Sequence, residues 1–398
     1  MPDSAVLPRP SQRSGGTTRS PVRDLLALTE NPDVISFAGG LPAPEHFDLD
    51  GLRRAFDAAL RQPGGLQYST SEGNPALREF IADRYTAQGL PTTRDEILVT
   101  TGSQQALSLL AMSLLDPGDT VFVERPSYLA ALQAFTLAGA RIVGVPTTVD
   151  GIDLDALNRL AEQHRPKLMY TVPTFQNPTG TSLDVTTREA LAALATEHGF
   201  RIVEDEPYRE LRYSGDPLPY LAAFANDHVI TVGSFSKVLA PGLRLGWIRT
   251  RADIHSTVVV TKQAADLHTS TVDQAAAAHY LTTGGLETAL DRIRVAYGQR
   301  RDAMLSALPQ ALPAGSTWST PHGGMFVWAT LPPGHDAAHH LTAAIEQSVA
   351  YVPGAPFYAE RPDPATMRLS FTTYEPATIR EGLGRLERSF RTGFMPAT

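Results

Sequence analysis

Between Phe47 and Leu290 the chain alternates short, almost uniformly apolar runs with longer stretches of helical periodicity. Runs this short and this apolar are typical of strands buried on both faces of a sheet. Helical stretches at 103–115 and 186–198 separate some of them, as in folds where helices connect parallel strands. The sequence therefore predicts an α/β fold with a mostly parallel central sheet flanked by helices. Its expected strands are 97–100, 120–123, 141–143, 167–172, 201–203 and 229–232.

The pattern changes near residue 290, which indicates a second, smaller α+β unit. A long helix is expected at 292–307, a strand at 324–328 and a final amphipathic helix at 378–390. Near the other end, Ser20 and Pro21 are suited to begin a helix over 20–29. We therefore expect three parts, consistent with a chain of 398 residues. These are a flexible N-terminal arm (1–19), a small domain (20–46 and 291–398) and a large domain (47–290).

Composition excludes several classes of function. The chain has no cysteine, which excludes disulfides, thiolate metal sites and a cysteine nucleophile. A net charge of −8 provides no basis for a cationic face, so no nucleic-acid partner is expected. No apolar run approaches the roughly 20 residues that span a bilayer, so no membrane partner is expected. The N-terminal arm lacks the apolar stretch of a secretory signal, and we expect a cytoplasmic protein.

One lysine is distinguished by its neighbours, in the segment Gly233-Ser234-Phe235-Ser236-Lys237. Lys237 directly follows a strand that should be buried, and a lysine amine that loses its proton there can form a Schiff base with an aldehyde. Ser234, Ser236 and the downstream Arg244 offer hydrogen bonds and charge to a phosphate dianion. The segment therefore predicts a phosphorylated aldehyde beside the amine, whereas a lone lysine after a strand is usually solvated.

Pyridoxal 5'-phosphate (PLP) matches this description, and its ring needs an anion at the pyridine nitrogen and a polar partner at the ring oxygen. Asp205 and Asn177 each follow a predicted strand, and ligands bind at the carboxyl ends of parallel strands. The alternatives are an exposed acid at a strand end and a simple Asn-Pro-Thr-Gly turn. Glu204 and Glu206, which flank Asp205, are expected to face away or to bind backbone.

A helix that opens at Gly102-Ser103-Gln104 follows the strand at 97–100. Free backbone N–H groups at such a helix start form an anion site, which would supply the other side of a phosphate cup. Tyr128 is suited to stack on a ring, although a tyrosine here is also a common core residue.

Together and in this order, these residues resemble the class I/II aminotransferases of PLP fold type I, over about residues 23–386. The segments 36–42, 102–107, 175–180, 262–269 and 323–328 look like the 2-aminoadipate aminotransferase branch, which is broad in substrate. The resemblance implies PLP as the cofactor and amino transfer between an L-amino acid and a 2-oxo acid.

The resemblance also implies a role for each matching residue. Lys237 would carry PLP as a Schiff base and move the proton between substrate and cofactor. Asp205 would pair with the pyridine nitrogen, and Tyr128 would stack on the ring. Asn177 and Tyr208 would hydrogen-bond the ring oxygen. The phosphate would be bound by Ser103, Gln104, Ser234, Ser236 and Arg244.

Four further residues are assigned by resemblance to the substrate or to a second subunit. Arg368 matches the arginine that takes the substrate α-carboxylate, beside Asn177, and Gly40 would lie against the substrate. Tyr68 matches a tyrosine that reaches the phosphate of the partner subunit, which implies a homodimer with shared active sites. Arg23 would reach an acidic substrate side chain; a solvent-facing arginine is the alternative.

Two other functions remain open from the residues. One is a PLP enzyme of specialised biosynthesis that eliminates, replaces, decarboxylates or cyclises instead of transaminating. The other is the aminotransferase-like effector-sensing domain of a transcription regulator. The amino donor and the acceptor are not indicated by the sequence.

Several histidines were considered for other roles. His335 and His339 have a spacing that can chelate metal, but we interpret them as a polar helix start, and no metal is expected. His322 borders the expected substrate pocket or is an ordinary loop residue.

Overall fold

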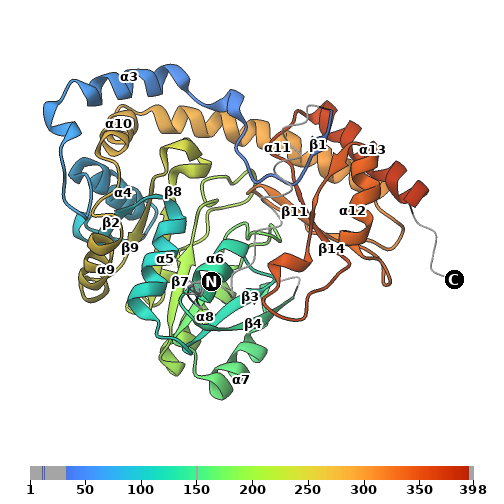
Figure 1. Cartoon of the computed structure of the whole chain (residues 1–398), viewed down its shortest axis with the longest axis horizontal. Helices are drawn as coiled ribbons and strands as arrows, with labels where there is room; N and C mark the ends of the chain where they lie inside the picture. Colours follow the sequence, from blue (N-terminus) through green and yellow to red (C-terminus); the bar gives the residue numbers. More distant parts are fainter. Residues whose placement is uncertain (1–10, 12, 14–32, 149–150, 394–398) are drawn as a thin grey trace, which may run out of the picture.

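The computed structural model describes residues 11, 13, 33–148 and 151–393 (Figure 1). The helix predicted at 20–29, and Arg23 with it, lie outside the described residues.

The main sheet is built from strands that correspond closely to the predicted apolar runs. They are β2 (Ile97–Thr100), β3 (Thr120–Arg125), β4 (Arg141–Thr148), β5 (Gly151–Ile152), β6 (Leu168–Thr171), β7 (Arg201–Asp205), β8 (Val229–Ser234) and β9 (Gly246–Arg249). Their order is β2-β9-β8-β7-β6-β3-β4-β5. The pairs from β8 through β7, β6 and β3 to β4 are parallel, whereas β9 runs antiparallel to β2 and β8. The predicted α/β fold with a mostly parallel sheet is thus confirmed.

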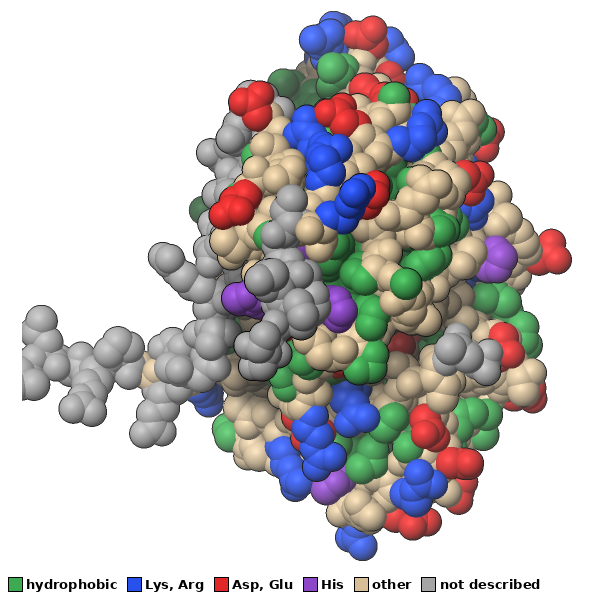
Figure 2. Space-filling view, turned by 90° about the vertical axis from the view of Figure 1, so that its right-hand side faces the viewer, with side chains coloured by type: hydrophobic (Ala, Val, Ile, Leu, Met, Phe, Trp, Pro, Cys, Tyr) green, Lys and Arg blue, Asp and Glu red, His purple; other side chains and the backbone are tan. Residues whose placement is uncertain are grey.

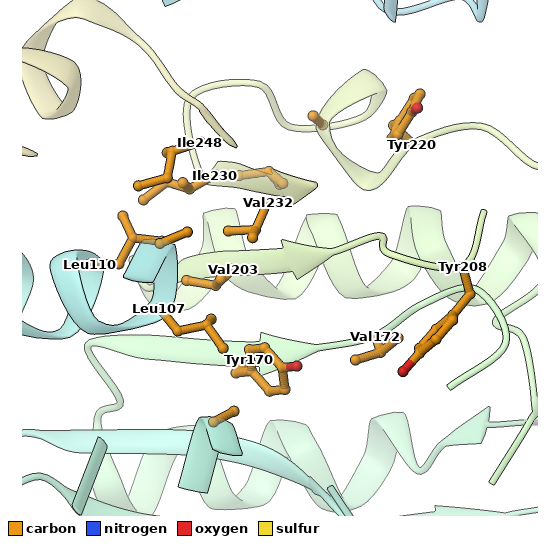
Figure 3. Packing of buried hydrophobic residues seen from close by; sticks show 14 of the residues in the cluster. Leu107, Leu110, Tyr170, Val172, Val203, Tyr208, Tyr220, Ile230, Val232 and Ile248 are labelled. Atoms are coloured by element: carbon orange, nitrogen blue, oxygen red, sulfur yellow. The ribbon is translucent and has the colours of Figure 1, made fainter. Parts of the chain in front are cut away.

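Among the residues described, the same unit contains eight α-helices. They are α3 (Leu49–Leu60), α4 (Pro75–Ala87), α5 (Gly102–Leu114), α6 (Leu129–Leu137), α7 (Leu154–His164), α8 (Val185–His198), α9 (Ala252–Ala265) and α10 (Thr271–Thr282). Of these, α4, α5, α6, α7 and α9 contact strands of the sheet, whereas α3 packs on α10. The helices predicted at 103–115 and 186–198 are α5 and α8. Figure 3 shows Leu107 and Leu110 of α5 beside Val203, Ile230 and Ile248 of the sheet. This packing fixes the start of α5 next to the ends of β7 and β8.

The C-terminal part of the chain forms a second layered unit. It contains α11 (Gly285–Ala311), α12 (Ala337–Glu346) and α13 (Pro376–Gly393), on the right of Figure 1 with a small antiparallel sheet. That sheet has the order β10-β11-β14-β13, with β10 (Thr317–Trp318), β11 (Phe326–Thr330), β13 (Val352–Pro353) and β14 (Thr366–Ser370). The long and final predicted helices lie within α11 and α13, and the predicted strand overlaps β11.

The N-terminal part of the described chain joins this second unit. β1 (Ile35–Ser36) pairs in parallel with β12 (Val349–Ala350), so residues far apart in sequence lie side by side. α11 continues without interruption through residue 290, where we expected a domain boundary. The division into domains at the stated residues remains a prediction.

The surface carries charges of both signs. On the face shown in Figure 2, Lys and Arg side chains are interspersed with Asp, Glu and hydrophobic ones. Among the described residues, no helix combines the length and the apolar character that a membrane crossing requires. The cytoplasmic location expected from the sequence remains a prediction.

Candidate active site

One cavity of about 240 Å³ collects most of the predicted cofactor residues. It lies where β6, β7 and β8 end and α5 begins. The predicted residues that line it are Ser103, Gln104, Tyr128, Asn177, Asp205, Tyr208, Ser234, Ser236, Lys237 and Arg244. Residues from six separate segments thus converge as the sequence analysis expected.

Lys237 lies on a short 3-10 helix, Phe235–Lys237, directly after β8. The hydroxyl of Ser234 accepts a hydrogen bond from the backbone N–H of Ser236 at 3.1 Å and so caps this turn. The Nζ atom of Lys237 donates to the carbonyl oxygen of Gly40 at 2.8 Å. Burial lowers the pKa of Lys237 to about 8, and the nearby cations Arg368 and Arg244 contribute. The amine is therefore available as a nucleophile and base near neutral pH.

Asp205 is the last residue of β7 and is buried. Its Oδ2 atom accepts a hydrogen bond from the hydroxyl of Tyr170 at 2.8 Å, while Oδ1 has no hydrogen-bond partner among the described residues. Burial raises the pKa of Asp205 to about 7; the Tyr170 hydroxyl opposes this shift and the charge of Glu206 adds to it. A buried carboxylate oxygen without a donor is costly. This oxygen therefore fits the protonated pyridine nitrogen of PLP.

The opposite end of the cavity fits a phosphate. α5 begins at Gly102, and the preceding Thr101 supplies no side-chain cap, so the first N–H groups of the helix are available to an anion. A Cβ atom on Gly102, whose φ is +76°, would lie 2.5 Å from Nη2 of Arg244. The guanidinium of Arg244 therefore lies directly against the start of α5. The positive charge of the arginine and the positive end of the helix dipole would both attract an anion at this end of the cavity.

Arg368, on β14, is held beside the cavity by Asn177. Asn177 donates to the hydroxyl of Tyr208 at 3.2 Å and accepts from Nη1 of Arg368 at 2.8 Å. The guanidinium of Arg368 lies 4.3 Å from the ring centre of Phe326 and 4.9 Å from that of Phe357. Burial lowers the pKa of Arg368 to about 10. A buried guanidinium with so little surrounding negative charge is suited to bind a carboxylate.

Of the predicted residues that the structure describes, three do not line the cavity: Arg368, which lies beside it, Gly40 and Tyr68. Gly40 contacts Lys237 through its carbonyl, and a Cβ atom at this position would lie 2.7 Å from the ring of Phe326. Tyr68 is 79% exposed and packs edge-on against His268, 5.9 Å between ring centres. Arg23 lies outside the described residues.

Glu204, Glu206 and His322, which have no assigned role in the site, lie outside the lining of this cavity. Glu204 accepts from the backbone N–H of Leu221 at 2.7 Å, which confirms that it binds backbone. Glu206 is buried and accepts from the hydroxyl of Thr174 at 2.8 Å. His322 is exposed and lines a separate cavity of about 810 Å³.

The helix start expected near His335 and His339 is confirmed, because α12 begins at Ala337 with Asp336 as its N-cap. Within the described ranges, no cluster of three or more potential metal ligands is present.

Two features of the site have no signal in the sequence. Tyr170 holds Asp205, but a tyrosine inside an apolar strand is most often a core residue and gives no separate signal. The ring pair Phe326 and Phe357, which encloses Arg368, comes from segments 31 residues apart whose proximity only the fold reveals.

Comparison with known proteins agrees with this geometry. Residues 32–386 match the family model "Aminotransferase class I and II". The chain is 42% identical to an aromatic-amino-acid aminotransferase of Thermococcus litoralis, over 96% of this chain and 94% of that one. It is 41% identical to a 2-aminoadipate transaminase of Thermus thermophilus, over 95% of each.

A solved structure has the same fold over nearly the whole chain. The kynurenine aminotransferase of Pyrococcus horikoshii, determined in complex with pyridoxamine phosphate, superposes with a TM-score of 0.92. It is 41% identical, over 97% of this chain and 98% of that one. These relatives support transamination over the other PLP outcomes and over the effector-sensing alternative. The chain belongs to the class I and II aminotransferase family, and it is a PLP-dependent aminotransferase similar to the 2-aminoadipate branch.

Proposed function

We propose that the chain moves the amino group of L-amino acids with large side chains to a 2-oxo acid in this cavity. The observation that carries the proposal is that Lys237 and the unpaired carboxylate oxygen of Asp205 belong to one cavity with a phosphate-binding end. PLP supplies an electrophilic carbon and a ring that accepts electrons.

Each side chain around PLP has a separate proposed role. Lys237 would hold the cofactor covalently, and its amine would serve as the base for the proton on the substrate Cα. Asp205 keeps the pyridine nitrogen protonated, and Tyr128 covers the ring. Asn177 and Tyr208 hydrogen-bond the ring oxygen. The phosphate is bound by Ser103, Gln104, Ser234, Ser236 and Arg244.

Arg368 and Asn177 bind the substrate α-carboxylate, with Gly40 against the substrate. The charge of Arg368, which contributes to the lowered pKa of Lys237 after burial, supports this role, because it acts at the position of the base. Arg23 remains a proposed contact for an acidic side chain.

The range of donors follows from the relatives. Their names specify aromatic amino acids, 2-aminoadipate and kynurenine, at 41–42% identity to this chain. We therefore expect activity with several aromatic donors and with L-2-aminoadipate. The test incubates the enzyme with each donor and 2-oxoglutarate and measures glutamate. Release of carbon dioxide or ammonia without glutamate would overturn the proposal.

A homodimer with shared sites is proposed for Tyr68. Its ring is largely exposed in a single chain, together with the nearby Leu66 and Leu267, and such apolar exposure favours a partner surface. Complementation tests this arrangement. A Lys237→Ala chain co-folded with a Tyr68→Ala chain forms mixed dimers with one intact site, so about a quarter of the wild-type activity should return. If Tyr68 serves its own chain, no intact site forms and no activity returns.

A further inference from the structure

The end of β3 carries a buried carboxylate that the proposed roles leave unused. Glu124 is 4% exposed, and its Oε2 atom accepts a hydrogen bond from the backbone N–H of Val172 at 3.0 Å. The same oxygen accepts from Nε2 of Gln176 at 3.4 Å. Val172 lines the active-site cavity, and Gln176 directly precedes Asn177. One carboxylate thus contacts two points on the segment that follows β6.

Gln176 is 2% exposed and uses both ends of its side-chain amide. Nε2 also donates to the carbonyl oxygen of Pro126 at 2.9 Å, two residues before Tyr128. Oε1 accepts from the backbone N–H of Thr179 at 2.8 Å and from its hydroxyl at 2.7 Å. The amide therefore ties the segment after β3 to the turn that contains Asn177.

We propose that Glu124 and Gln176 form a positioning pair, which fixes the two walls of the cavity that carry the cofactor-contacting side chains. One wall is the segment from Pro126 to Tyr128. The other is the turn around Asn177, which in turn holds Arg368. Side chains that contact a reactant need such support, because a small displacement of these side chains lowers the reaction rate many-fold.

The hydrogen-bonding role of Glu124 determines which way the amide of Gln176 faces. Oε2 of Glu124 is an acceptor, so the NH₂ group of Gln176 turns toward it and toward the carbonyl oxygen of Pro126. The carbonyl end of the amide then meets the two donors of Thr179. Burial raises the pKa of Glu124 to about 7, and Oε2 still accepts when the proton is on Oε1. A methionine at position 124 offers no oxygen acceptor, so the hydrogen bonds from Val172 and Gln176 would both be lost.

The experiment compares two variants, Glu124→Met and Gln176→Met, with the control Glu197→Met, at an exposed glutamate on α8. In each PLP-loaded enzyme, the absorbance of bound PLP is titrated with pH, and kcat and KM are measured for one amino donor. Thermal unfolding reports on the fold.

Displaced walls should change the environment of the ring oxygen and of the carboxylate-binding arginine. We expect the titration midpoint of both variants to move by about 0.5 pH unit or more, and kcat/KM to fall about 10-fold or more. The control should match the wild type. Wild-type midpoint and kcat/KM in both variants would overturn the proposal, even if they unfold at lower temperature. Failure of both variants to fold would also overturn it, because the pair would then belong to the core alone.

This inference rests on the role proposed above for Asn177, so Asn177→Ala is measured in parallel. A shifted midpoint in Asn177→Ala with unchanged pair variants refutes the positioning pair and leaves the proposed role of Asn177 intact. An unchanged midpoint in Asn177→Ala refutes that role and the pair together.

Discussion

Tyr170 donates a 2.8 Å hydrogen bond to Oδ2 of Asp205, and Oδ1 of this buried carboxylate has no partner among the described residues. Figure 3 shows Tyr170 on β6, one strand away from Val203 of the strand that ends at Asp205. The tyrosine fixes one oxygen, and the other is available to a donor such as the proposed pyridine nitrogen of PLP. Cofactor-free protein therefore contains a carboxylate that is incompletely satisfied.

The first prediction concerns the stability of cofactor-free protein. The pKa of Asp205 rises from 3.8 to about 7 in the folded chain. Between pH 4 and 7 the unfolded chain releases this proton while the folded chain keeps it, so stability falls as pH rises through that window. Asp205→Asn removes this loss. At pH 8 the free energy of unfolding of Asp205→Asn, measured by urea denaturation, should exceed that of the wild type by on the order of 4 kcal/mol. The difference between the two proteins should vanish near pH 4. Parallel pH profiles for the two proteins would refute it.

The second prediction concerns the rate at which PLP attaches. Burial and two arginines lower the pKa of Lys237 to about 8. Only the neutral amine attacks an aldehyde, so the rate of covalent attachment should rise with pH through a midpoint near 8 and then level off. Arg368→Ala removes a nearby cation and should move this midpoint upward, whereas Arg380→Ala, at an exposed position on α13, should not. Stopped-flow absorbance measures the rate. A midpoint near the ordinary lysine value of 10.5 would contradict the burial argument.

The third prediction concerns the phosphate end of the cavity. Gly102→Ala places a methyl group 2.5 Å from the guanidinium of Arg244 and should weaken PLP binding about 10-fold or more. Gly118→Ala is the matched control, because Gly118 also has a positive φ, +94°, but no atom lies within 4 Å of the added Cβ. Fluorescence titration with PLP compares the two. Equal losses of affinity would mean that backbone strain, and not the arginine contact, is responsible.

More of the fold than of the site could be predicted from the sequence. Apolar runs identified the buried parallel strands, because strands covered on both faces have few other compositions. β9 was missed, since it begins with Gly246 and ends in Arg249, which is buried through hydrogen bonds that no pattern indicates. The residues proposed to bind PLP could be predicted because their types occur together within short segments that resemble those of the family. Tyr170 and Glu124 could not be predicted in this way. Each of them hydrogen-bonds a residue on or just after a neighbouring strand, and the sequence does not show which strands are neighbours.

The fourth prediction concerns substrate binding. Arg368→Lys loses the planar pair of donors that a carboxylate requires, so KM for the amino donor should rise roughly 10- to 100-fold while bound PLP is retained. Arg380→Lys is the control, exposed on α13. Steady-state kinetics with one amino donor and saturating 2-oxoglutarate give KM and kcat for both variants and the wild type. An unchanged KM with reduced kcat would assign Arg368 a role other than carboxylate binding.

The most direct measurement identifies the residue that carries the cofactor. PLP-loaded protein is treated with borohydride, digested and mapped by mass spectrometry. The account predicts a phosphopyridoxyl group on the peptide containing Lys237, at close to one per chain, and none in Lys237→Ala. A reduced adduct on another lysine, or one that persists in Lys237→Ala, would contradict it.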